Sequence, residues 1–213
     1  MPEITIEEII GFWFEGIDDQ RQINKNASPY NKWFKEDPSL DRVIKEKYEG
    51  DLKRAGRGEF REWENSAKGR LALVLLFDQF PRNMYRHKRE GYAYDHLARN
   101  LALRSVEDGQ DRELQLIERH FLYIPFMHSE DIKCQDLSVK YYGQLIEDCR
   151  KINPLNVFYY ESAYGYAQGH HNMIKQYGRF PYRNIALNRE STPDEKTFLE
   201  SNSSFRWNAK EKK

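Results

Sequence analysis

The 213-residue sequence predicts an all-α fold from three observations. Apolar residues recur with a helical period of three to four in almost every patterned segment, whereas strand-like alternation is scarce. Proline, glycine and capping residues stand where those segments begin and end. The connections are short, which favours antiparallel helical hairpins, about 8–10 helices in all. We therefore expect a single helical domain over residues 1–200 and a polar tail over residues 201–213.

The first half of the chain predicts five helical segments. Ser66 is a suitable N-cap for the most apolar of them, and Pro81 should end that helix because proline lacks the backbone N–H group. Asp37-Pro38 combines an N-cap with a proline in the first turn and so marks another helix start. The expected segments are 5–15, a short helix after Ser28-Pro29 that carries Trp33 and Phe34, 38–55, one or two turns over 59–65, and 67–80.

The second half predicts five more helices. Ser129 should be the N-cap of a helix whose first turn holds Glu130 and Asp131, where negative charge favours the helix dipole. Thr192-Pro193-Asp194-Glu195 contains an N-cap, a first-turn proline and a capping-box glutamate. The expected helices are 92–108 before Gly109, 112–124 before Pro125, one from Ser129 to about Ile152, 155–177 before Gly178, and a short one after Thr192.

The net charge and the length of the apolar segments limit which partners the protein can bind and where in the cell it can lie. The 34 basic and 34 acidic residues balance, which argues against a nucleic-acid or anionic-membrane binder. The N-terminus is acidic where a signal peptide would be basic, and the apolar run over 71–77 is too short to span a bilayer. Cys134 and Cys149 fall on one expected helix, too far apart to bridge. These features predict a cytoplasmic protein with reduced thiols.

Common catalytic and metal-binding motifs are absent from the sequence. It contains no Gly-x4-Gly-Lys-Ser/Thr, Gly-x-Gly-x-x-Gly, Gly-x-Ser-x-Gly or His-Glu-x-x-His pattern, and no Glu-x-x-His pair of the di-iron bundles. Two cysteines cannot supply a four-cysteine zinc site. We therefore expect no metal site from these patterns, while the cofactor and the oligomeric state stay open.

The first cluster of candidate site residues is Asp78, Arg82 and Asn83. Asp78 ends the most apolar segment, where a carboxylate is costly to bury unless it meets a cation or hydrogen-bond donors. Arg82 is the nearest such cation in the sequence. The pair either ties a corner of the fold or belongs to a ligand site.

The second cluster contains Glu118, His128 and Glu130. Because His128 precedes the expected N-cap Ser129, its ring could reach an anion bound at the positive end of the following helix. A histidine in a turn is otherwise a surface or capping residue, and Glu130 has the simpler role of complementing the helix dipole.

The third cluster lies in a basic stretch near the C-terminus. No acidic residue occurs between Glu161 and Glu190, whereas His170, Arg179, Arg183 and Asn184 do. Guanidinium groups recognise carboxylates and phosphates with two parallel hydrogen bonds, so the stretch could bind a small anion. Alternatively its cations, which also include Lys175 and Arg189, could pair with the acidic N-terminal segment, which holds Glu3, Glu7, Glu8, Glu15, Asp18 and Asp19.

The same residues give the sequence its resemblance to a known family. The signatures are Gly69-Arg70-Leu71-Ala72-Leu73, 76–83 (Leu-Phe-Asp-Gln-Phe-Pro-Arg-Asn), Glu118-Arg119, 121–131, His170, 178–184 and 191–199. In this order they resemble the bacterial family known as domain of unknown function 924. The resemblance implies a tetratricopeptide-like, right-handed array of helices but no reaction. The family usually has His at the position of Tyr182, so any function of that histidine would be altered here.

Three functional hypotheses follow. In the first, a groove binds a small anionic ligand or an acidic peptide through Arg82, Arg179 and Arg183, with Asn83 and Asn184 as further donors. In the second, the protein is a hydrolase or transferase for a phosphate or carboxylate compound, with His128 or His170 as acid or base and Asp78, Glu118 or Glu130 orienting it. In the third, the motifs tie corners of a scaffold that binds protein partners elsewhere.

Overall fold

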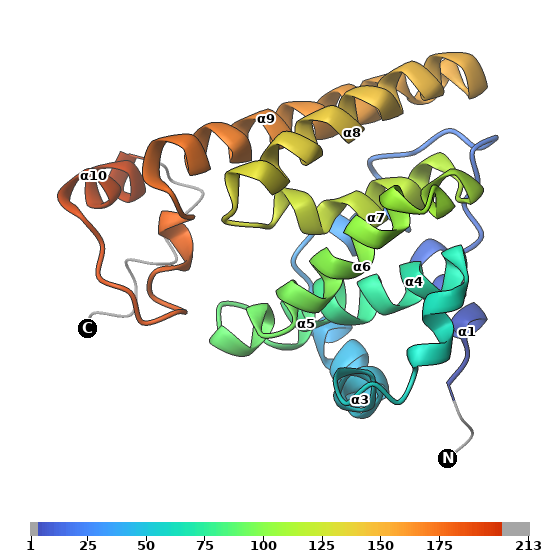
Figure 1. Ribbon diagram of the computed structural model, residues 1–213, viewed down its shortest axis with the longest axis horizontal. Helices are drawn as coiled ribbons and strands as arrows, with labels where there is room; N and C mark the ends of the chain where they lie inside the picture. The colour runs from blue at the N-terminus through green and yellow to red at the C-terminus, as the bar shows by residue number, and fades with distance from the viewer. Residues whose placement is uncertain (1–3, 202–213) are drawn as a thin grey trace.

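The computed structural model describes residues 4–201, and all regular structure within that range is helical, as the sequence predicted (Figure 1). The α-helices are α1 (Ile6–Phe14), α2 (Tyr30–Phe34), α3 (Pro38–Gly56), α4 (Ala67–Val74), α5 (Phe80–Met84), α6 (Asp95–Glu107), α7 (Leu116–Met127), α8 (Ile132–Ile152), α9 (Val157–Tyr177) and α10 (Pro193–Ser201). Short 3₁₀ turns cover Arg61–Asn65, Arg89–Tyr92, Gln110–Glu113, Pro154–Asn156 and Pro181–Arg183. The expected tail lies outside the described residues, apart from Ser201.

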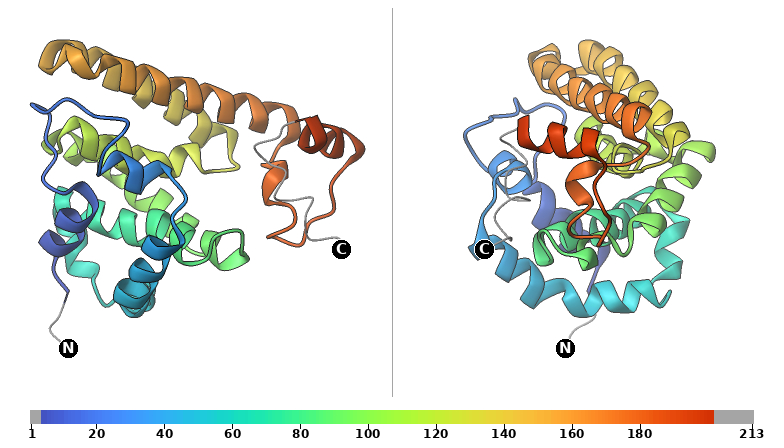
Figure 2. Two further views of the ribbon diagram at one scale, coloured as in Figure 1. Left: turned by 180° about the vertical axis from the view of Figure 1, so that it is seen from behind. Right: turned by 90° about the vertical axis from the view of Figure 1, so that its left-hand side faces the viewer.

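Two layers of helices enclose the core. Helices α8 and α9 form a long antiparallel hairpin that covers α7, while α4 and α6 pack on the other side of α7 (Figures 1 and 2). Helix α1 packs against α4, and α3 packs against α5. The core between them is dominated by aromatic side chains; Trp13, Phe80 and Phe121 are each at most 1% exposed. The segment after α9 folds back beside the end of the hairpin and leads to α10. The hairpins agree with the sequence analysis, while a tetratricopeptide-like arrangement stays a prediction.

Pro81 does not end the central helix, contrary to the prediction. The helix continues from α4 through a π-helical turn, Leu75–Gln79, into α5. In this turn the N–H of Phe80 donates to the carbonyl of Leu75, a wider i→i+5 bond. Proline is tolerated in the first turn of a helix, because the N–H groups there have no intrahelical acceptor and the missing N–H costs no hydrogen bond. The π turn places Pro81 in such a position, so the chain stays helical as far as Met84.

Two further boundaries also differ from the prediction. Pro125 lies inside α7, which continues to Met127. Ser129 is not the N-cap of α8, because the helix begins at Ile132 and the carboxylate of Asp131 accepts from the N–H of Lys133. The hydroxyl of Ser129 instead accepts from the N–H of Asp131 in the turn before the helix. Glu130 therefore lies outside the first turn of α8 and is free to contact another segment.

Several local signals are confirmed. Asp37 and Ser66 cap α3 and α4 through their side chains, and Gly178 follows α9 with a φ of 70°. Thr192 and Glu195 form the expected reciprocal bonds at the start of α10. Among residues 4–201, no helix combines the length and apolar character needed to cross a bilayer.

Gly69 allows the 3₁₀ turn before α4 to lie close to that helix. A Cβ at this position would lie 2.8 Å from the carbonyl carbon of Trp63 and 2.9 Å from the hydroxyl of Ser66. Both distances are shorter than van der Waals contact. The backbone of one element would have to move to admit any side chain.

We therefore expect Gly69→Ala to lower the free energy of unfolding by about 1–3 kcal/mol, because it overpacks a rigid backbone contact. Gly165→Ala is the matched control, since a Cβ at that helical position meets no atom within 4 Å. The control should raise stability by about 0.5–1 kcal/mol. Urea denaturation of both variants measures the difference, and equal stability of the two would contradict the assignment.

Candidate functional site

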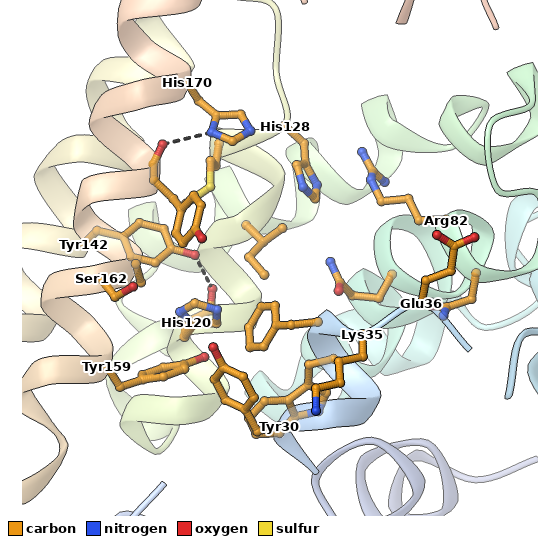
Figure 3. A pocket seen from close by; sticks show the side chains of 18 of the residues that line it. Tyr30, Lys35, Glu36, Arg82, His120, His128, Tyr142, Tyr159, Ser162 and His170 are labelled. Atoms are coloured by element: carbon orange, nitrogen blue, oxygen red, sulfur yellow. Dashed lines mark hydrogen bonds between the residues drawn. The ribbon is translucent and has the colours of Figure 1, made fainter. Parts of the chain in front are cut away.

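A cavity of about 570 Å³ opens between α2, α5, α7 and α9. Arg82, His128 and His170 lie at one end, hereafter the histidine end (Figure 3). At the other end, hereafter the aromatic end, Tyr30, His120 and Tyr159 line the cavity (Figure 3). Trp33 and Phe34 line it there too, since the ring of Phe34 contacts those of Trp33, His120 and Tyr159. Lys35, Glu36 and Arg86 also line the cavity, with Lys35 near Tyr30 and Glu36 near Arg82 in Figure 3.

The histidine end is built on the carboxylate of Asp78, whose side chain is 1% exposed. The N–H at Nδ1 of His128 donates to both carboxylate oxygens, at 2.9 and 3.0 Å, and Nε2 of Gln79 donates at 2.6 Å. Burial acts to raise the pKa of Asp78, but the adjacent Arg82 and His128 outweigh it and hold that pKa below its usual value. Asp78 is therefore an anion at neutral pH.

His128 faces that anion through one nitrogen only. Burial and then the charge of Arg82 lower the pKa of His128, although Asp78 acts to raise it. The neutral ring then carries its proton on Nδ1, because Nδ1 is the atom that meets the carboxylate. Among the described residues Nε2 has no hydrogen-bond partner, and the side chain lines the cavity with 20% of its surface exposed. A lone pair on Nε2 is thus available to a molecule in the cavity.

Arg82 is already engaged by carboxylates. Its two terminal nitrogens donate to the two oxygens of Asp95 at 2.9 and 3.0 Å, and Nη1 lies 3.1 Å from Asp78. Arg183 approaches the same Asp95, at 3.6 Å, from the C-terminal segment. It is buried and does not line the cavity, and its guanidinium stacks over Phe180, 4.5 Å from the ring centroid.

Asn83 lines the cavity, but its amide nitrogen donates to Asp41 at 2.8 Å. Arg86 donates to both oxygens of the same carboxylate at 2.8 Å. This part of the wall ties α5 to α3.

His170 completes the histidine end from α9. Its Nδ1 bonds the carbonyl of Tyr166 at 2.9 Å, and its ring meets Phe180 edge on, with centroids 5.3 Å apart. Burial and the charge of Arg183 lower the pKa of His170, although the bond to Tyr166 acts to raise it. Two histidines with lowered pKa values therefore face one space.

The sequence analysis did not point to the aromatic end, because tyrosines at helical spacing, such as Tyr142 and Tyr159, are ordinarily core residues. Tyr142 and Tyr159 are indeed buried, but both also line the cavity. A periodic signal was present: His120, Ile124 and His128 recur every four residues along α7. Residues 159, 162, 163, 166 and 170 recur every three or four along α9 and also line the cavity. Each set forms one helical face, and the two faces meet across the cavity.

The other predicted site residues make structural contacts. Glu118 completes a capping box with Gln115 at the start of α7 and pairs with Lys68. Glu130 accepts from the N–H of Phe180 at 2.9 Å and pairs with Arg189. Arg179 and Asn184 both donate to Glu195, which is 2% exposed. None of Glu118, Glu130, Arg179 and Asn184 lines the cavity, and neither does Glu195.

The basic stretch finds its carboxylates away from the N-terminal segment, contrary to the pairing alternative. Arg179 meets Glu195, Arg183 meets Asp95 and Arg189 meets Glu130. Tyr182 belongs to the same segment and stacks on Phe180, with centroids 5.3 Å apart. These contacts anchor the C-terminal segment against α6 and the start of α8.

The described residues contain no group of three or more His, Cys, Asp or Glu side chains arranged to hold a metal ion. The histidine end places only two histidines and one buried carboxylate together.

The comparisons with known proteins agree with this architecture. Residues 9–203 match the model of a family described as bacterial protein of unknown function (DUF924). The chain belongs to this family. The solved structure of a protein of unknown function from Agrobacterium tumefaciens has a similar fold, with a TM-score of 0.74 and 33% sequence identity. The similarity covers 92% of this chain and 97% of that one, while no curated protein matches. The DUF924 chain thus shares its fold across nearly its whole length with that protein.

Glu195 should stabilise the C-terminal segment without affecting the cavity. We expect Glu195→Gln to speed amide hydrogen exchange over residues 178–199, because hydrogen bonds to a charged group contribute about 1.5–3 kcal/mol and Arg179 would lose its ionised partner. Exposed Glu200 on the same helix provides the control Glu200→Gln. Hydrogen exchange followed by mass spectrometry makes the comparison, and equal exchange in the two variants would refute the structural role.

Proposed function

We propose that this DUF924 protein binds a small organic anion in the cavity, with its carboxylate or phosphate at the histidine end. The observation that carries the proposal is the convergence of His128 and His170, from two separate helices, on a cavity that also holds Arg82. Asn83 lies on the same wall. An acidic peptide is a less suitable ligand, because part of the cavity is lined by aromatic rings from α2.

The electrostatics of the two histidines support an anion. Burial is the main cause of the lowered pKa values of both histidines, and in addition Arg82 lowers that of His128 and Arg183 lowers both, so the guanidinium groups disfavour a second cation there. The same guanidinium charges favour an anion, although Asp78 and Asp95 offset part of their effect. Because Asp95 already engages both arginines, the ligand would meet the guanidinium groups through space. It would meet the imidazole rings directly once Nε2 takes up a proton, because a neutral ring held through Nδ1 offers the anion only a lone pair.

The size and lining of the cavity support an amphipathic ligand. A volume of about 570 Å³ lies within the range typical of small-molecule sites. Trp33 and Phe34 offer apolar surface at the aromatic end. A ligand with a ring at this end and an anion at the other would use both parts of the cavity.

The test compares two adjacent histidines of α9. Benzoate, phenyl phosphate, acetate and inorganic phosphate are added at 10 mM with chloride at equal ionic strength as the reference, and the melting temperature and heat of binding are measured. We expect benzoate or phenyl phosphate to raise the melting temperature. His170→Gln should weaken that binding about threefold to tenfold, the equivalent of one hydrogen bond.

His171→Gln is the matched control, because His171 points to Asp136, at 2.9 Å, and does not line the cavity. Its affinity should equal that of the wild type. Failure of all four anions to bind, or an equal loss in both variants, would reject the anion site.

A second candidate function is acid–base catalysis in the same cavity. The orientation of His128 by Asp78 favours it, because a neutral imidazole held through Nδ1 presents the lone pair of Nε2 to a substrate. In a hydrolase or transferase of a carboxylate or phosphate compound, Nε2 would accept the proton of the attacking water or hydroxyl. The buried carboxylate would then stabilise the imidazolium that forms.

The catalytic proposal requires turnover that depends on His128. A panel of p-nitrophenyl carboxylate and phosphate esters provides the assay, and we expect His128→Gln to lower kcat/KM about 10²–10⁴-fold, as for a lost general base. Since the pKa of His128 is lowered, the wild-type rate should persist below pH 6.5, the ordinary value for histidine. The exposed residue His96 provides the control His96→Gln. Turnover equal in both variants would exclude His128 as the base.

A further inference from the structure

Two polar side chains at the aromatic end of the cavity are buried without partners. His120 is 4% exposed and Tyr159 is 3% exposed. Neither ring nitrogen of His120 nor the hydroxyl of Tyr159 has a hydrogen-bond partner among residues 4–201. Buried polar groups are nearly always hydrogen-bonded, so three free atoms at one place indicate a binding role.

The two groups lie side by side on the cavity wall. His120 comes from α7 and Tyr159 from α9, and their ring centroids are 5.2 Å apart with an interplanar angle of 49°. Figure 3 shows His120 between the rings of Tyr142 and Tyr159, and the centroid of Tyr142 is also 5.2 Å from that of His120. Phe34 and Phe121 meet the imidazole edge on. The polar atoms are thus enclosed by aromatic faces.

The aromatic rings around His120 and Tyr159 favour a ligand group without charge. Burial lowers the pKa of His120 to about 3, so the ring is uncharged and offers one N–H donor and one acceptor nitrogen. The hydroxyl of Tyr159 adds a group that can donate or accept. A carboxylate would be costly to desolvate among these rings, and a cation would leave the N–H and O–H donors unused. A planar group with a donor beside an acceptor matches both residues and stacks on the aromatic rings.

We propose that His120 and Tyr159 form a subsite for a planar lactam or amide, so that the ligand of the whole cavity is a nitrogen heterocycle bearing a carboxylate or phosphate. This inference rests on the proposed anion site at the histidine end. The heterocycle would lie at the aromatic end, with its N–H and C=O edge toward His120 and Tyr159.

Three probes separate the two ends of the cavity. Orotate carries a lactam edge and a carboxylate, benzoate carries the carboxylate alone, and uracil carries the lactam edge alone. A two-ring pair, 2-oxo-1,2-dihydroquinoline-4-carboxylate and 1-naphthoate, repeats the comparison with ligands that fill more of the cavity. Isothermal calorimetry should show each lactam acid binding more tightly than its hydrocarbon counterpart.

Removal of one hydroxyl provides the decisive variant. Tyr159→Phe should weaken the binding of the lactam acids about threefold to tenfold and leave that of benzoate and 1-naphthoate unchanged. Tyr48→Phe is the matched control, since the hydroxyl of Tyr48 is also buried without a partner but lies outside the cavity. His120→Phe is a second variant with the same expected selectivity. Because the polar atoms it removes are unpartnered, we expect it to melt at or above the wild-type temperature.

The outcomes distinguish this inference from the anion site. If benzoate and orotate bind equally, or if Tyr159→Phe weakens both equally, the lactam subsite is rejected while the anion site stands. If uracil alone binds and depends on Tyr159, the anion site is rejected while the subsite stands. If no probe binds at 10 mM, both proposals are overturned.

Discussion

The buried charge of Asp78 is the constraint on which the histidine end of the cavity depends. A carboxylate that is 1% exposed stays ionised only if a nearby cation balances its charge and donors hydrogen-bond its oxygens. Without them it would take up a proton. Arg82 supplies the charge, and Gln79 and His128 supply hydrogen bonds. Arg82 also binds Asp95 at the start of α6, and Arg183 joins that carboxylate from the C-terminal segment. One anion thereby links the π turn to α5 and α7 directly, and to α6 and the C-terminal segment through one further ion pair.

The π turn makes this arrangement geometrically available. Asp78 lies within the turn and Arg82 lies four residues further on in α5, so the two side chains meet on one face of a continuous helix. If the helix ended at Pro81, Arg82 would lie in a loop and its side chain would have no fixed direction relative to Asp78. Wide turns of this kind are frequent at functional sites, where an extra residue redirects a side chain. The prediction that the helix ends at Pro81 was therefore wrong at the feature that positions the site.

Local signals in the sequence predicted most helices, but not how their side chains pair. Caps such as Asp37 and Ser66 accept hydrogen bonds from backbone N–H groups within three residues, so the local sequence is enough to predict them. The helix ends predicted at Pro81 and Pro125 were wrong, because a π turn accommodates the first proline and the last turn of α7 accommodates the second. The pairing of Asp78 with Arg82 was foreseen because it is local. The hydrogen bond from His128 spans 50 residues, and no local pattern specifies it.

The neutral state of the histidines links binding to protons. In the free protein, burial and, after it, guanidinium charge lower the pKa values of His128 and His170 and so keep both rings neutral. An anion at the histidine end would oppose the effect of Arg82 and Arg183 and raise the pKa of both rings. By thermodynamic linkage, a ligand that raises a pKa binds more tightly as the pH falls toward it. A general base, in contrast, must stay neutral to accept a proton. Simple anion binding would therefore strengthen on acidification, whereas catalysis by His128 would weaken, and the direction of the pH dependence separates the two functions that this cavity supports.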